Sequence, residues 1–327
     1  MDLESLAATL GSRGEPDYRA RQVWEWAARG AASFEEMTNL PRALRDAMAE
    51  RVPFSTLSLE GEARSTDGTL KALFRTADGL AVETVLMRYR DGRRSLCLSS
   101  QSGCPLTCTF CATGAMRFGR NLTSSEILDQ ALHFRRLEPV DHAVFMGMGE
   151  PLMNLDAVIG ACERLPDLGV STAHTTVSTV GWLPGIERLA GEGPRVRLAL
   201  SVHAAEPGLR SELMPVNERY PLPDVLAACL RWREARRRRV FVEYLMLEGV
   251  NDAPEQAEAL ADLLAPREAF KVNLIPYNPT DSGLRGSAPE AIAEFEAVLA
   301  GRRLPVTVRL TRGRDIAAAC GQLAAAS

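Results

Sequence analysis

The chain has 327 residues, of which 46% are hydrophobic and 24% charged, a composition that excludes a disordered or fibrous protein. Its 38 basic and 42 acidic residues give a formal net charge of -4 at pH 7, which excludes a protein that is basic all over but not one with a local basic surface. No apolar stretch is long enough to cross a bilayer and the N-terminus lacks a signal-peptide pattern, so the sequence predicts a cytoplasmic protein with no membrane segment.

The first part of the chain has a helical pattern. Apolar residues recur every three or four positions in residues 18–29 and 33–51, as they do along one face of a helix. From residue 57 to residue 88 the period changes to two, which predicts a hairpin or a small sheet. We therefore expect a helical domain over residues 1–55 and a β extension over residues 56–93.

Strand-like apolar runs alternate with helical stretches after residue 94. The expected strands are residues 95–99, 142–146, 175–179, 196–202, 240–247 and 272–275. The expected helices are residues 124–136, 155–165, 183–190, 222–235 and 254–264. Six β/α units in this order predict an α/β fold with a partial parallel (β/α)6 barrel over residues 94–327. Functional residues of such barrels lie at the C-terminal ends of the strands.

Three of the seven cysteines, Cys104, Cys108 and Cys111, have a C-x3-C-x2-C spacing. A structural disulfide framework is not expected in a chain without a secretion signal. Three thiolates on one short loop can instead ligate three irons of a 4Fe-4S cluster. The fourth iron then stays open to the amine and carboxylate of S-adenosylmethionine. A zinc site is the alternative, but it would need a fourth ligand and a different spacing.

Polar residues follow several of the predicted strands. Gly149 and Glu150 come directly after the second strand, where glycine lets the backbone approach a cofactor and the carboxylate can accept from an amino group. Four further residues have the same position relative to later strands, namely Ser178, Ser201, His203 and Asn278. Each alone could be an ordinary loop residue, but their common position favours one site.

Two further cysteines, Cys320 and Cys97, have sequence surroundings that differ from those of a core cysteine. Cys320 is flanked by alanine and glycine, with Arg312 and Arg314 nearby, which is compatible either with a small buried side chain or with a reactive, partly exposed thiolate. Cys97 belongs to the first barrel strand and is expected to point towards the same cavity. Cys162 and Cys229 fall within amphipathic helices and are expected in the core.

These motifs resemble the RlmN/Cfr family of radical S-adenosylmethionine RNA methyltransferases over nearly the whole chain. Residues 14–19 and 34–38 are similar to the accessory RNA-binding domain of that family. The similarity to its core covers residues 83–85, 99–101, 104–114, 147–151 and 315–323.

The resemblance implies a reaction that uses two molecules of S-adenosylmethionine per turnover. The first methylates Cys320, and the second is cleaved reductively to a radical that takes a hydrogen atom from the S-methyl group. The methylene radical adds to an adenine carbon, after which Glu83 accepts a proton and Cys97 forms a transient disulfide with Cys320. The residues implied to contact the second molecule are Gly149, Glu150, Ser178, Ser201, Val202, His203 and Asn278.

The resemblance also implies the substrate and the partners. RlmN-type members methylate carbon 2 of an adenosine in 23S rRNA, some of them also a tRNA adenosine, whereas Cfr-type members methylate carbon 8 of the same rRNA base. Residues 149–151 and 311–313 are similar to the RlmN branch, while residues 15–19 and 213–221 are similar to Cfr as well, and we favour carbon 2. An electron donor such as flavodoxin or ferredoxin is implied. No heptad seam demands a partner chain, so we expect a monomer.

Two alternatives of a different class remain at this point. One is a zinc-stabilised RNA-binding module without catalysis, and the other is a radical enzyme that does not methylate, such as an activase of a protein partner. The run of four arginines at residues 236–239 could contact RNA phosphates or could be a solvated helix end, and the second interpretation is favoured.

Overall fold

One sheet runs through most of the molecule in the computed structural model, which describes residues 1–324. Its strand order is β1-β2-β3-β4-β7-β8-β9-β10-β11-β12. Every neighbouring pair from β4 onward is parallel, and every pair from β1 to β4 is antiparallel. The sheet therefore has a parallel barrel part and an antiparallel extension.

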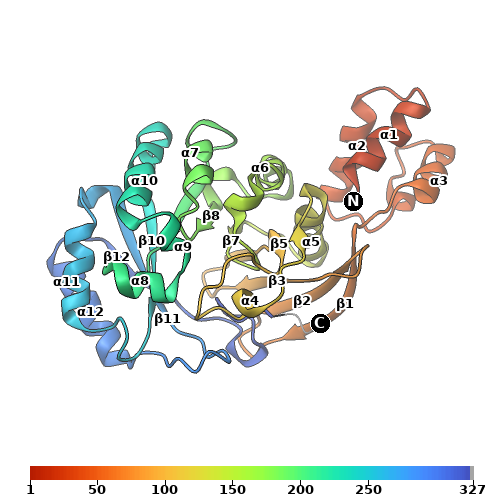
Figure 1. Cartoon of the computed structure of the whole chain (residues 1–327). Helices are drawn as coiled ribbons and strands as arrows, with labels where there is room; N and C mark the ends of the chain where they lie inside the picture. Colours follow the sequence, from red (N-terminus) through yellow and green to blue (C-terminus); the bar gives the residue numbers. More distant parts are fainter. Residues whose placement is uncertain (325–327) are drawn as a thin grey trace.

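The parallel part confirms the predicted partial barrel. Its strands are β4 (Arg94–Cys97), β7 (His142–Phe145), β8 (Thr175–Thr179), β9 (Arg197–Ser201), β10 (Val240–Met246), β11 (Phe270–Pro276) and β12 (Val306–Val308). The helices that alternate with them are α5 (Ser124–Leu137), α6 (Leu155–Arg164), α7 (Leu183–Gly191), α10 (Leu222–Arg236), α11 (Pro254–Leu263) and α12 (Pro289–Gly301). These helices cover the outer face of the sheet (Figure 1). Both α12 and β12 were absent from the prediction, so the parallel part is one β/α unit longer than expected.

The antiparallel extension consists of β1 (Leu57–Arg64), β2 (Leu70–Thr76) and β3 (Ala81–Arg88). Strand β3 pairs with β4, so the predicted small sheet is continuous with the barrel sheet. Alternate residues of β2 are buried, as the period of two requires. The extension thereby carries Glu83 on β3, two residues before Val85, which pairs with Cys97 of β4.

Three helices precede the sheet: α1 (Leu3–Ser12), α2 (Tyr18–Ala28) and α3 (Arg42–Arg51). They stand together at one end of the molecule (Figure 1). The expected single helix over residues 33–51 is wrong, because a short 3-10 turn at Phe34–Glu36 is separated from α3 by residues up to Pro41. Proline disfavours helical backbone in the residue before it, so the helix begins only after Pro41.

The N-terminal helices pack on the barrel through α2. The indole of Trp24 is buried and its Nε1 donates to Asp167 Oδ2 at 2.6 Å, in the turn that follows α6. One continuous hydrophobic core includes side chains of these helices and of the barrel. Among residues 1–324, no helix is both long and apolar enough to span a bilayer.

The remaining elements are short. They are β5 (Gln101–Ser102), α4 (Ala112–Ala115), β6 (Arg120–Asn121), α8 (Pro207–Leu213) and α9 (Val216–Arg219). Strand β5 and helix α4 flank the loop that carries the three clustered cysteines. Helices α8 and α9 follow β9 and cover the same end of the barrel.

Candidate active site

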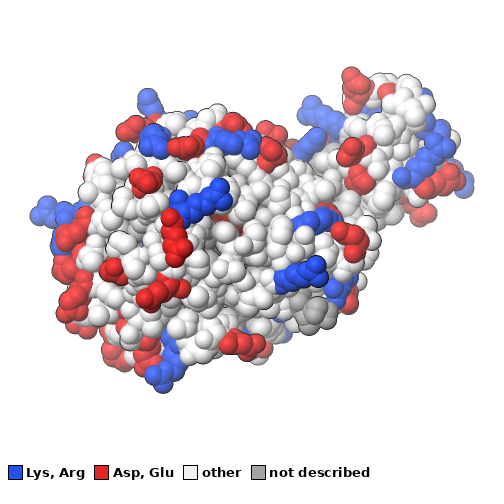
Figure 2. Space-filling view, viewed as in Figure 1, with Lys and Arg blue, Asp and Glu red and all other residues white. Residues whose placement is uncertain are grey.

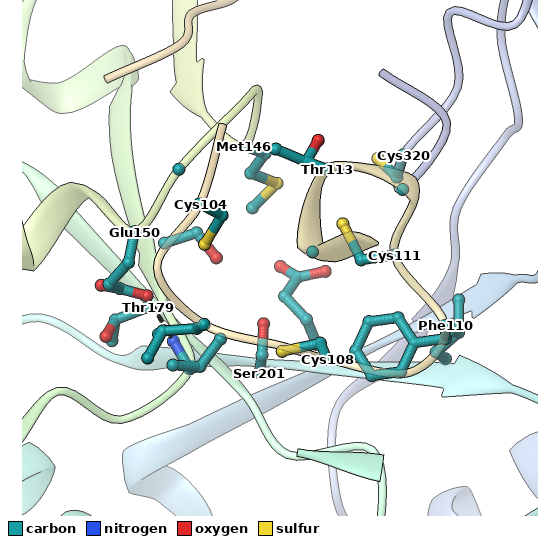
Figure 3. A pocket seen from close by; sticks show the side chains of 18 of the residues that line it. Cys104, Cys108, Phe110, Cys111, Thr113, Met146, Glu150, Thr179, Ser201 and Cys320 are labelled. Carbon is teal, nitrogen blue, oxygen red and sulfur yellow. Dashed lines mark hydrogen bonds between the residues drawn. The ribbon is translucent and has the colours of Figure 1, made fainter. Parts of the chain in front are cut away.

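The cysteine loop lies over the C-terminal ends of the parallel strands. Cys104, Cys108 and Cys111 line a cavity of about 150 Å³ together with residues that follow β7, β8 and β9. Figure 3 shows the three side chains spread along the curved cysteine loop. We call this cavity the cysteine pocket. Cys320 also lines this pocket, in the arrangement that the family resemblance implies.

The segment after β7 forms the wall opposite Cys320. Gly149 has a φ of +96°, and a Cβ there would lie 2.5 Å from the Cβ of Gln101, so only glycine fits this close approach. The backbone N–H of Glu150 donates to Gln101 Oε1 at 2.8 Å. Gln101 therefore fixes the loop that presents Gly149 and Glu150 to the pocket.

The Glu150 carboxylate is buried and already accepts two backbone hydrogen bonds. The N–H of Leu152 donates to Oε1 at 3.1 Å and the N–H of Val180 donates to Oε2 at 2.9 Å. Burial raises the pKa of Glu150 to about 7, and these hydrogen bonds act in the opposite direction. The Thr179 side chain also hydrogen-bonds the carboxylate. Because two carboxylate oxygens offer about four lone-pair directions, the group can still accept from a bound amine.

Ser178, Ser201 and His203 lie on the pocket wall, at or after the ends of β8 and β9. His203 has a φ of +58° and its Nδ1 accepts from the N–H of Leu245 at 3.0 Å. Burial lowers the pKa of His203 to about 3, so the imidazole is neutral at physiological pH. Because Nδ1 of the neutral ring accepts a hydrogen bond, Nε2 carries the ring hydrogen and can donate.

Two expected contact residues lie off the pocket wall. Val202 is fully buried in the main core, so its side chain contributes packing. Asn278 is buried below Cys320, and its Nδ2 donates to the carbonyl of Cys320 at 3.3 Å. The structure thus places Asn278 against the segment that carries the thiol.

Cys97 and Cys320 line one further cavity of about 140 Å³ at the side of the cysteine pocket. Cys320 is exposed to these cavities, whereas Cys97 is buried. Burial raises the pKa of Cys97 to about 12, with a smaller contribution from Cys320. The two thiols therefore line this smaller cavity together, whereas Cys97 is not among the residues that line the cysteine pocket.

Glu83 does not line either cavity. Its side chain is buried on β3 and its Oε1 lies 2.9 Å from Lys71 Nζ. The same ammonium donates to the carbonyl of Ala317 at 3.3 Å, in the segment that leads to Cys320. Glu83 is therefore connected to the Cys320 segment through Lys71.

Three buried polar residues near the pocket were missed by the sequence analysis. Glu243 lies on its floor, accepts from Asn273 Nδ2 at 2.9 Å and has Arg309 Nη1 at 3.6 Å. A carboxylate inside the apolar run of β10 was the available signal. Gln101 lies within residues 99–101, which are similar to the family core, but the resemblance assigned it no role. Arg210 had no signal, because its role depends on contacts between segments far apart in the sequence.

The donor set fits an iron-sulfur cluster better than a single ion. Among the residues that the structure describes, no three Cys, His, Asp or Glu side chains converge on one metal-ion position. A 4Fe-4S cluster does not require such convergence, because each thiolate binds a different iron. The pocket beside the three thiols has an apolar and aromatic side, with Phe110 against His203, and a polar side at Glu150, Ser178 and Ser201.

Comparison with known proteins agrees with this donor set. Residues 98–264 match the Radical SAM superfamily, and residues 1–53 match the ribosomal RNA large subunit methyltransferase N-terminal domain. The chain is 47% identical to the dual-specificity RNA methyltransferase RlmN of Anaeromyxobacter dehalogenans, with 98% of this chain and 90% of the relative covered. It is 45% identical to that of Geobacter sulfurreducens, with 99% and 90% covered.

The chain is also similar to solved structures of radical SAM enzymes. A radical SAM methyltransferase from Sphaerobacter thermophilus superposes with a TM-score of 0.93 at 43% identity, over 98% of this chain and 97% of that chain. SuiB of Streptococcus suis, solved with S-adenosylmethionine, has a TM-score of 0.51 at 17% identity over 69% and 53% of the two chains, and so shares the fold alone.

Proposed function

Because this chain belongs to the RlmN family of radical S-adenosylmethionine RNA methyltransferases, we propose that it adds a methyl group to carbon 2 of adenosine in 23S rRNA and in tRNA. The observation that carries the proposal is the position of Cys320. It lies in a cavity with the three cluster cysteines and in a second cavity with Cys97. A cluster enzyme that did not methylate through a protein thiol would have no use for two thiols there.

The residues of the chain have distinct roles in this proposal. When bound, the 4Fe-4S cluster and S-adenosylmethionine supply the methyl group and the radical chemistry that lets it reach an aromatic carbon. Cys104, Cys108 and Cys111 would hold the cluster, and Gly149, Glu150, Ser178, Ser201 and His203, which line the same pocket, would contact the cofactor. Val202 packs in the core behind this wall, whereas Asn278 holds the carbonyl of Cys320.

Three residues act on the RNA. The Cys320 sulfur carries the methyl carbon and becomes covalently bound through it to the adenine ring. Glu83 accepts the proton that the ring must lose. The Cys97 thiol then gives up its proton and its sulfur attacks the Cys320 sulfur, so that the S–S bond forms and the S–C bond breaks. The electron pair of the broken bond takes up a proton on the methylene carbon, which leaves as the methyl group of the RNA, and the reductant returns the disulfide to two thiols. The disulfide-forming step requires the sulfurs of Cys97 and Cys320 to face one cavity. Both residues line the smaller cavity of about 140 Å³.

The partners follow from this activity. The helical domain, residues 1–55, contributes to RNA binding, residues 56–93 form the β extension and residues 94–327 form the catalytic domain. Cluster reduction calls for a small electron-transfer protein such as flavodoxin or ferredoxin. The protein acts as a monomer in the cytoplasm, where its RNA substrates are made.

The test is anaerobic reconstitution with iron and sulfide, followed by incubation with unmodified 23S rRNA or tRNA, reductant and S-adenosylmethionine. Mass spectrometry of the nucleosides is expected to show 2-methyladenosine, which is absent with the Cys320→Ala variant although its cluster absorbance is unchanged. Methylation at carbon 8 would contradict the position and place the chain in the Cfr branch. An RNA that is methylated by Cys320→Ala would contradict the proposed thiol route.

A further inference from the structure

A second large cavity, of about 720 Å³, carries a concentration of positive charge. We call it the arginine groove. Its cations include Arg93, Arg197, Arg238, Arg239, Lys271 and Arg312, and no Asp or Glu is among its described lining residues. The distribution differs from the face in Figure 2, where positive and negative side chains are interspersed. A groove with charge of one sign suits a polyanion.

The arginine groove opens at the end of the barrel where the parallel strands begin. Arg197 is the first residue of β9, Arg238 and Arg239 directly precede β10, and Lys271 is the second residue of β11. The cysteine loop lies over the opposite ends of these strands. The two openings of the barrel therefore differ in chemistry.

Several of these cations have no carboxylate partner among the described residues. Arg197, Arg238 and Lys271 form no ion pair, and Arg239 Nε donates only to the backbone carbonyl of Glu268. Burial and the charge of Arg238 lower the pKa of Arg197. Such a group of like charges is stabilised when an anion binds between them.

The arginine run at residues 236–239 is divided between two roles. Arg236 donates to the carbonyls of Leu189 and Gly193 and so fastens α10 to the end of α7. Arg238 and Arg239 instead line the arginine groove. The favoured interpretation of this run as a solvated helix end is therefore incomplete.

Flat side chains accompany the charges. The Tyr89 ring lies 4.2 Å from the Arg93 guanidinium and 5.3 Å from that of Arg312, and Phe241 lies 5.9 Å from that of Arg197. Leu310 on the rim has 73% of its surface exposed. Cations with aromatic and apolar surfaces are the features that bind unpaired nucleotides.

The arginine groove leads to the reacting sulfur. Cys320 is the residue that lines the groove, the cysteine pocket and the cavity that holds Cys97. We propose that RNA enters the barrel through the arginine groove, so that its backbone lies on Arg197, Arg238, Arg239 and Lys271 while the target adenosine reaches Cys320 from the side opposite the cysteine loop. This inference rests on the proposed RNA methylation.

The test compares two double variants that lose the same charge. Arg238→Gln/Lys271→Gln removes two cations of the groove, whereas Arg231→Gln/Arg285→Gln removes two exposed cations from other surfaces, each paired with a carboxylate. Binding of a transcript of the 23S peptidyl-transferase region is measured over a series of KCl concentrations. Thermal unfolding checks that both variants are folded.

We expect only the groove variant to lose affinity for the transcript. Losing two phosphate contacts makes the negative slope of log K against log salt shallower by about 1.4 and weakens binding about 25-fold at roughly 0.1 M salt. The control variant is expected to bind like the wild type. If the groove variant binds the transcript as tightly as a wild type that methylates RNA, the proposed path through the arginine groove is overturned and the proposed function is not. A wild type that neither binds nor methylates RNA would overturn the proposed function, and the groove with it.

Discussion

Lys71 on β2 and Glu83 on β3 form an ion pair, with 2.9 Å between Nζ and Oε1, although only 5% of the Glu83 side chain is exposed. Lys71 also donates to the carbonyl of Ala317, three residues before Cys320. Oε2 of Glu83 has no hydrogen-bond partner among the described residues. One ammonium therefore fixes both the proposed proton acceptor and the segment that carries the methylated thiol.

Replacing Lys71 by methionine is expected to slow the release of RNA more than its capture. The change leaves the buried Glu83 carboxylate without its counter-charge, which costs about 3 kcal/mol of unfolding free energy, and frees the Ala317 carbonyl. A carboxylate that has lost its orientation takes the ring proton more slowly. Denaturing gels are expected to show the covalent RNA-protein adduct accumulating in Lys71→Met.

The double variant Lys71→Met/Glu83→Gln separates stability from positioning. Because no buried charge remains, most of the lost unfolding free energy is expected to return, as a double-mutant cycle in guanidinium measures. The adduct still accumulates, since the proton acceptor is gone. A Lys71→Met variant that loses stability but shows no extra adduct would mean that Lys71 is structural only.

Cys97 is expected to be unreactive towards iodoacetamide near neutral pH. Burial raises its pKa to about 12, against an ordinary value of 9.0, and only the thiolate is alkylated. Because the folded pKa is raised, the thiolate fraction at pH 8 is about a thousand-fold lower than in the unfolded chain, and labelling accelerates up to about pH 12. Peptide mass spectrometry of the anaerobic holoenzyme measures this rate.

The same peptide labelled in guanidinium is the control for Cys97. Its rate is expected to level off above about pH 9, where an ordinary thiol is ionised. The raised pKa also has a consequence for stability. Unfolding releases a proton from Cys97 between about pH 9 and pH 12, so the free energy of unfolding falls as pH rises through that interval. Rapid labelling of native Cys97 at pH 8 would contradict both expectations.

Gly149→Ala is expected to weaken S-adenosylmethionine binding at least tenfold. The added Cβ would lie 2.5 Å from Gln101 Cβ, and Gln101 holds the N–H of Glu150. Gly249→Ala is the matched control, because that glycine also has a positive φ, +65°, but no atom within 4 Å of the added Cβ. Both variants bear about 1 kcal/mol of backbone strain. Calorimetric titration that finds equal losses of affinity would contradict a role of the close approach.

The barrel could be predicted because its strands are near-continuous apolar runs. Val240–Met246 is one such run, and the structure ends β10 one residue before the expected end. Strand β12 was missed because it has three residues, follows Pro305 and exposes Thr307. Its place in the sheet comes from pairing with β11, a contact that no local pattern records.

The site was predictable where chemistry requires a fixed spacing. The cysteine loop and Gly149-Glu150 are local motifs, and the structure brings them together with Cys320. The Lys71–Glu83 pair and the arginine groove are not local, since each joins side chains from separate strands. Only the register of the sheet places these side chains together, and that register depends on the whole fold.

The contacts of Arg210 on α8 are also non-local, and we expect them to contribute to the free energy of unfolding. Arg210 is fully buried, and it donates to Asn217 Oδ1 at 2.6 Å and to the carbonyls of Val180 and Ser201 at 2.8 and 3.3 Å. Burial lowers its pKa to about 10, so the guanidinium stays charged at pH 7. It thereby joins the C-terminal ends of β8 and β9, where Ser178 and Ser201 face the cysteine pocket.

Arg210→Met is expected to lower the free energy of unfolding by about 3 kcal/mol, because a buried acceptor left without its donor costs about 1–3 kcal/mol. Arg210→Lys should recover only part of this loss, since one ammonium cannot reproduce the planar fork. Arg231→Met on α10 removes an exposed arginine and should change stability by less than about 1 kcal/mol. Guanidinium unfolding of the three variants measures the difference. Similar losses for Arg210→Met and Arg231→Met would show that the fork does not hold the two strand ends.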